Sequence, residues 1–121
     1  MLKIRAEQMG ALGYARRELF VERGVAAVRE HWPQRYFEMG HQQTEALVNA
    51  AIHLADKHGF RTGQQQLRFV NLTVALGIDF PKNREMPWAA EVLNDPHLTP
   101  EVKLDRLVEK TGRYLRYDGA V

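Results

Sequence analysis

The sequence contains no cysteine and no serine. Without cysteine, the chain cannot form a disulfide framework, a thiol nucleophile, an iron–sulfur cluster or a cysteine-ligated zinc site. The only aliphatic hydroxyls belong to threonines, and Thr62 and Thr99 are explained as helix N-caps. Thr73 falls within a predicted helix, where its hydroxyl is expected to bond to its own turn. The chain therefore offers no evident hydroxyl or thiol nucleophile.

Long hydrophobic runs and an excess of one charge are also absent. Unbroken apolar stretches reach only about four residues, far below the roughly twenty needed to cross a bilayer. The opening Met1–Arg5 leads into polar residues and has no apolar run of signal-peptide length. We therefore expect no membrane partner and a cytoplasmic location. Seventeen Lys and Arg oppose fifteen Asp and Glu, so the formal net charge is only +2 and favours no acidic partner.

The residues that are present fit one globular domain. The 121 residues are 45% hydrophobic and 26% charged, which is close to the composition of soluble domains. A chain of this length buries roughly two-thirds of the surface that its unfolded form exposes. We therefore expect a single domain over residues 1–121.

The first predicted helix spans residues 5–31 and contains no proline. Its apolar residues follow three- and four-residue steps, but they form two stripes on nearly opposite faces. Either the helix breaks between Phe20 and Gly24, or one long helix packs against different parts of the core along its length. We favour the long helix, bent near Gly24. The opposed stripes also suggest a homodimer. The first stripe is Met9, Leu12, Ala15 and Leu19, and the second is Val21, Val25, Val28 and Trp32.

Three of the later helices have clear start or stop signals. Helix 41–58 ends before Gly59, and Thr62 with Gln65 predicts a capping box that starts a helix ending at Gly77. Pro33 stops the first helix, and residues 79–87 read as a loop. A short helix is expected over residues 87–93. A last helix is expected to begin at Thr99 and to end at residue 111 or 115. Residues 113–121 either continue this helix or form a loose tail. No segment alternates with a period of two. We predict an all-α, irregular bundle of four to five helices without a sheet.

The charged and polar residues do not form an evident reaction centre. His53 and His58 are five residues apart, so they point about 140° away from each other on a helix rather than toward one metal ion. Glu38 and His41 have a three-residue spacing, but Gly40 and a predicted helix boundary separate them. We therefore predict a non-enzymatic protein with no metal and no cofactor.

A nucleic-acid-binding role has two sequence features in its favour. Arg5, Arg16 and Arg23 would share one helical face, and residues 113–117 alternate arginines with tyrosines, as a single-strand binder can. Acidic residues interrupt the first helix, however, and the net charge is small. A solvated face with ion pairs explains the same residues, so we regard nucleic acid as the least favoured partner.

Large apolar side chains in the predicted turns suggest a protein-binding surface. Trp, Tyr, Phe and Met are enriched at the cores of protein interfaces. The alternative is that these side chains pack beneath the bundle as part of the core. The candidate partner-binding residues are Trp32, Tyr36 and Phe37 at the first break, and Phe80, Met86 and Trp88 around the proline loop.

Apolar and turn residues over most of the chain resemble a family of small helical bacterial proteins that are encoded beside effector genes of type VI secretion systems. The resemblance implies an accessory protein or co-chaperone that binds a larger chaperone or an effector, with no catalytic motif to carry over. An immunity protein that neutralises a cognate effector is the alternative. The segments that carry the resemblance are Met1–Arg5 with Glu7–Met9, Phe69–Leu72, Ala75–Phe80, Pro87–Ala89, Leu93–Pro96 and Leu98–Pro100.

Overall fold

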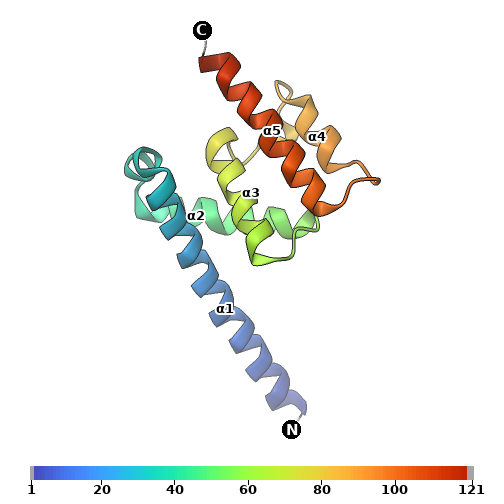
Figure 1. Cartoon of the computed structure of the whole chain (residues 1–121). Coiled ribbons are helices and arrows are strands. Elements are labelled where there is room, and N and C mark those ends of the chain that lie inside the picture. The colour runs from blue at the N-terminus through green and yellow to red at the C-terminus, as the bar shows by residue number, and fades with distance from the viewer. Residues whose placement is uncertain (1, 120–121) are drawn as a thin grey trace.

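A computed structural model describes the backbone of residues 2–119 and the side chains of residues 17–115 (Figure 1). This part of the chain contains five α-helices and a short 3-10 turn, and no strand, so the all-α prediction is confirmed. The elements are α1 (Leu2–His31), α2 (Pro33–Lys57), α3 (Gly63–Leu76), η1 (Phe80–Lys82), α4 (Pro87–Leu93) and α5 (Pro100–Gly119).

The first helix, α1, is continuous from Leu2 to His31, so the favoured prediction of one long helix is confirmed and the alternative, a break between Phe20 and Gly24, does not occur. Trp32 leaves the helical region with φ −130° and ψ 58°, as expected for a residue that precedes a proline. The side chains of Met9, Leu12 and Ala15 lie outside the described residues. From the first apolar stripe the structure therefore describes only Leu19, which is 60% exposed.

The second helix begins earlier than predicted and contains a kink. A first segment starts at Pro33, which suits the first helical turn because it has no N–H to leave unpaired. Gly40 then interrupts the helix with φ 79° and ψ 169°, a backbone conformation that favours glycine. Thr44 donates its hydroxyl to the Gly40 carbonyl oxygen at 2.8 Å, which fixes the start of the second segment. The prediction of a start at His41 missed the segment from Pro33 to Met39.

The ends of α2 and α3 follow the predicted local chemistry. Gly59 has φ 85° and ends α2, and the Phe60 amide donates to the Ala55 carbonyl oxygen at 2.9 Å. At the start of α3, the Gln65 amide donates to the Thr62 hydroxyl at 3.1 Å, and the Thr62 amide donates to the Gln65 side chain at 3.3 Å. The capping box is therefore confirmed.

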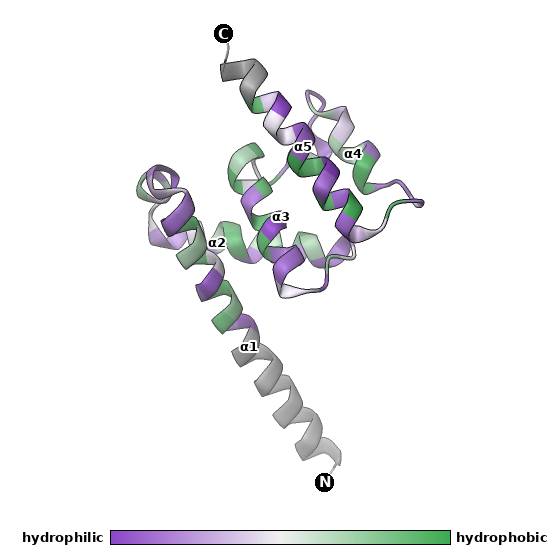
Figure 2. Cartoon of the chain, in the orientation of Figure 1, coloured by the Kyte–Doolittle hydropathy of each residue, from purple (hydrophilic) through white to green (hydrophobic). Residues whose placement is uncertain are grey.

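The core consists of two groups of buried side chains that meet at α3, which contacts α1, α2 and α5 (Figure 1). Phe69 and Leu72 of α3 belong to the first group, and Val70 and Val74 belong to the second. Figure 2 shows hydrophobic and hydrophilic positions side by side along α3 and α5, as expected for helices with one buried face. The first group, the aromatic cluster, includes Phe60, Phe69, Phe80, Met86, Leu93, Leu104 and Leu107; the second, the valine cluster, includes Val25, Val28, Val48, Ala51, Ile52, Val70 and Val74.

The last helix, α5, is joined to α3 and α4 by polar contacts. Its Thr99 cap accepts the Val102 amide at 3.3 Å, as predicted. Lys103 donates to the carbonyl oxygen of Leu93, the last residue of α4, at 2.8 Å. Arg68 of α3 pairs with Asp105 at 2.8 Å. The helix continues through Gly119, so residues 113–119 are helical and do not form a loose tail.

His58, at the end of α2, gives the fold a dependence on pH. Burial, followed by the positive charges of Lys103 and Lys57, lowers the pKa of His58 below its ordinary value of 6.5. His58 therefore takes up a proton more readily in the unfolded chain than in the folded chain, and this difference matters once the pH falls below about 6.5. The stability that neutral His58 contributes is fully present above about pH 6.5 and is lost as the pH falls toward the lowered pKa.

We expect His58→Gln to reduce this acid sensitivity, because glutamine does not titrate. Urea midpoints at about pH 7.5 and about pH 5.5 measure the effect. The wild-type midpoint should fall further between the two values than that of His58→Gln. His53→Gln, at an exposed position of α2, is the matched control and should behave like the wild type. Equal losses in the wild type and in His58→Gln would show that other groups cause the acid sensitivity.

Candidate protein-binding surface

The structure divides the six predicted partner-binding residues into two sets. Phe80 and Met86 are only 1% and 5% exposed and belong to the aromatic cluster, so a partner cannot reach them. The prediction for these two residues is wrong because both side chains pack inside the aromatic cluster, where the Phe80 ring centroid lies 5.5 Å from that of Phe69. Trp88 is half-buried and packs against Tyr114 at a centroid distance of 6.3 Å. The large side chains around the proline loop therefore belong to the aromatic cluster or pack against it.

The aromatic residues at the first break are less buried than Phe80 and Met86: Trp32 and Tyr36 pack partly against the valine cluster, and Phe37 is exposed. Trp32 is half-buried and donates its indole N–H to the Asn71 Oδ1 atom of α3 at 3.3 Å. Tyr36 is also half-buried, and its hydroxyl lies 3.0 Å from the Nδ1 atom of His41 across the Gly40 kink. These two contacts fix the segment from Pro33 to Met39 to α3 on one side and to the rest of α2 on the other.

Phe37 is the most exposed of the large hydrophobic residues that the structure describes, with 87% of its surface open to solvent. It follows Tyr36 directly, so its backbone belongs to the segment that the Trp32 and Tyr36 contacts hold in place. An exposed phenylalanine on a helical segment can enter a partner's apolar pocket with little loss of backbone freedom. Among the six predicted residues, Phe37 is therefore the best placed to contact another protein.

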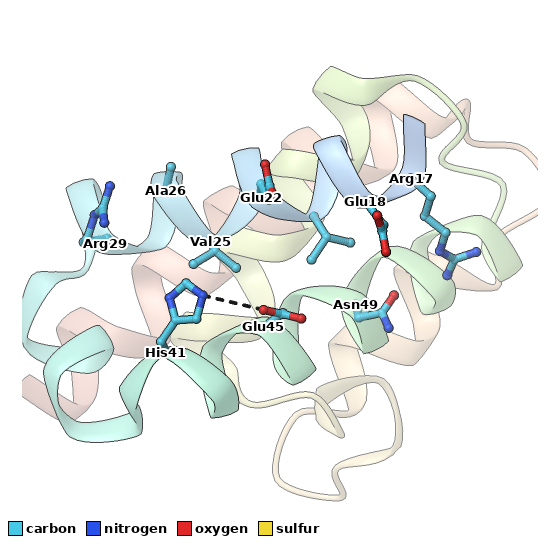
Figure 3. A pocket seen from close by; sticks show the side chains of 10 residues that line it. Arg17, Glu18, Glu22, Val25, Ala26, Arg29, His41, Glu45 and Asn49 are labelled. Carbon is cyan, nitrogen blue, oxygen red and sulfur yellow. Dashed lines mark ion pairs between the residues drawn. The ribbon is translucent and has the colours of Figure 1, made fainter. Parts of the chain in front are cut away.

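A groove between α1 and α2 forms a second surface feature, with a volume of about 450 Å³ (Figure 3). Val21, Val25 and Ala26 provide its apolar residues. His41 and Glu45 face it from α2, and the His41 Nε2 atom lies 3.6 Å from the Glu45 carboxylate, a contact drawn in Figure 3. The remaining residues that line the groove are Arg17, Glu18, Glu22, Arg29 and Asn49.

Sequence reasoning missed the groove because its two sides come from different helices. Residues 17–29 and 41–49 become neighbours only once α1 and α2 pack against each other. The spacing of Glu18 with Glu22, and of His41 with Glu45, was visible in the sequence, since residues four apart share a helix face. Nothing in the sequence indicated that these two faces meet.

The remaining candidate sites do not assemble in the described part of the chain. No three His, Asp or Glu side chains among the described residues are placed so that they could hold a metal ion. Of the residues considered for nucleic-acid binding, Arg113 pairs with Glu109 at 2.7 Å and Tyr114 packs against Trp88. The side chains of Arg5, Arg16, Arg116 and Tyr117 lie outside the described residues. No helix in the described range is both long and apolar enough to span a bilayer.

Comparison with known proteins finds no matching family model, no matching curated protein and no matching solved structure. Within its described residues the protein is all-α, exposes the aromatic residue Phe37 and has a groove between α1 and α2. Its proposed function therefore depends on these features and on the resemblance described above.

Proposed function

We propose that this chain is a non-enzymatic accessory protein or co-chaperone that binds a chaperone or an effector during type VI secretion. The binding role is supported by the exposure of Phe37 on a segment held in place by Trp32 and Tyr36. The link to type VI secretion is supported by the resemblance of the apolar and turn residues described above. An accessory role needs a surface that another protein can recognise, and the exposure of Phe37 on a helical segment supports this role.

The energetics of Phe37 favour its use as an anchor. Burying a phenylalanine side chain stabilises a protein or a complex by about 1.5–3 kcal/mol. In this chain that gain is not realised, since the ring is 87% exposed. Interface hot spots are enriched in aromatic residues that fill a pocket on the partner. A partner that supplies such a pocket would recover the unrealised burial.

We expect Phe37→Ala to weaken binding to the partner by about 2 kcal/mol or more, which is roughly thirtyfold in the dissociation constant. The fold should be unaffected, because an exposed side chain makes few contacts. Co-purification from cells that also express the neighbouring genes, followed by titration with the captured product, measures the effect.

Val108→Ala is the control, since Val108 is an exposed apolar residue of α5. It should leave the captured amount unchanged. Recovery of the wild-type chain without any neighbouring gene product would contradict the proposed function. Deletion of the gene separates the two roles: loss of effector delivery supports a co-chaperone, whereas self-intoxication would indicate an immunity protein.

A further inference from the structure

The groove between α1 and α2 has two regular sides. Glu18, Glu22 and Arg29 form the α1 side at steps of four and seven residues, and His41, Glu45 and Asn49 form the α2 side at steps of four (Figure 3). Residues at these spacings lie in ridges along a helix, and helices pack by placing their ridges in such grooves. The groove therefore has the shape and periodicity that suit a third helix.

The apolar residues of the groove have small side chains. Val25 is 5% exposed and belongs to the valine cluster, while Ala26 is open to solvent. Together with Val21 they leave room for a larger apolar side chain from an occupant. Charged and polar residues surround this apolar patch, which is typical of protein interfaces. Small-molecule pockets, in contrast, are lined predominantly by apolar residues.

The charges around the groove specify the occupant further. Glu18 and Glu22 are four residues apart on α1, an arrangement in which like charges repel. No ion pair between described side chains involves either carboxylate, and both line the groove together with Glu45. Arg17 and Arg29 lie at the two ends of the lining, and the three glutamates lie between them, so a Lys or Arg side chain in the middle of the groove would find carboxylates on both helices (Figure 3). Arg29 lines the groove further along α1 and suits an acidic residue on the same occupant.

We infer that this groove binds an amphipathic α-helix of a partner protein. The helix is about three turns long and places a bulky apolar side chain against Val21, Val25 and Ala26. It also places a Lys or Arg among Glu18, Glu22 and Glu45. The inference extends the proposed function, on which it rests, by naming the kind of segment that the partner presents.

Two synthetic peptides test this inference. Both are fluorescent, helix-forming sequences of about four turns with one stripe of leucines. They are identical except that one has lysines beside the stripe and the other has glutamates at the same positions. We expect the lysine peptide to bind about tenfold or more tightly in fluorescence-anisotropy titrations, and its affinity to fall as the salt concentration rises.

Variants of the protein locate the binding site. Ala26→Trp fills the groove from an exposed position and should weaken lysine-peptide binding by about tenfold or more. The double change Glu18→Gln and Glu22→Gln should reduce the preference for lysine over glutamate to about threefold or less. Glu109→Gln removes an exposed carboxylate of α5, outside the groove, and should change neither result.

Three outcomes would overturn the inference: equal binding of the two peptides, binding of neither, and unchanged binding to Ala26→Trp. Its failure can be told apart from failure of the proposed function. If Ala26→Trp still captures the neighbouring gene product while Phe37→Ala does not, the accessory role stands and the groove is not the binding site. If the lysine peptide binds but no gene product is captured, the groove stands and the proposed accessory role fails.

Discussion

Replacing Phe69 with alanine is expected to lower the free energy of unfolding by about 3–5 kcal/mol. Phe69 is fully buried, and its ring centroid lies 5.5 Å from that of Phe60 and 5.5 Å from that of Phe80. Its removal leaves a cavity at the centre of the aromatic cluster and breaks both aromatic pairs, each of which stabilises by about 0.5–1.5 kcal/mol beyond burial. Since a typical domain is stable by only about 5–15 kcal/mol, the variant should be close to unfolding.

Denaturant unfolding followed by far-UV circular dichroism measures this loss. Phe37→Ala is the matched control, because it makes the same chemical change at a position that is 87% exposed. Its free energy of unfolding should stay within about 0.5 kcal/mol of the wild type. If both variants unfolded at the same denaturant concentration, the aromatic cluster would not be the centre of the fold.

The features that were predictable from sequence depend on residues close together in the chain. The capping box joins Thr62 to Gln65, and the end of α2 depends on Gly59 and its immediate neighbours. These residues satisfy backbone groups within one turn of themselves, so their chemistry is the same wherever the helix lies. Helix type and most helix ends could therefore be predicted, whereas the segment from Pro33 to Met39 was missed because Pro33 was read only as a stop signal.

The candidate surface could be predicted only in part, because exposure depends on long-range packing. Phe37 and Phe80 both follow helix-breaking signals and look alike in the sequence. The structure exposes 87% of the first and 1% of the second. What separates them is their contacts with distant elements: η1 places Phe80 against Phe69 of α3, whereas Phe37 points to solvent from a segment held by the bond between Trp32 and Asn71, 39 residues apart. Neither contact has a local signal.

Long-range packing also determines the role of Gly24 in α1, which could not be predicted from the sequence. In the sequence, Gly24 appears only as a weak point, about 1 kcal/mol less favourable than alanine in a helix. In the structure it is buried where α1 crosses α2, and an added Cβ atom would lie 2.5 Å from Cγ1 of Val48. Carbon atoms normally approach to about 3.5–4.0 Å, so the glycine allows a contact between helices that alanine would prevent.

We therefore expect Gly24→Ala to destabilise the fold by about 1–3 kcal/mol, although alanine is the better helix former. Val48 cannot relieve the clash easily, because it is fully buried and valine is stiff about its first side-chain torsion. The cost of overpacking should exceed the gain of about 1 kcal/mol in helix propensity. Denaturant unfolding measures the difference.

A double-mutant cycle with Val48→Ala separates the clash from any general effect on α1. Alanine at position 48 removes the Cγ1 atom that a Cβ at position 24 would meet, so the double variant should be more stable than the sum of the two single changes predicts. The coupling free energy should fall in the range of about 0.5–3 kcal/mol found for contacting residues. If Gly24→Ala were as stable as the wild type and showed no coupling to Val48→Ala, the two helices would not be in close contact here. The groove that they form would then lose its geometric basis, because its sides are set by the same crossing.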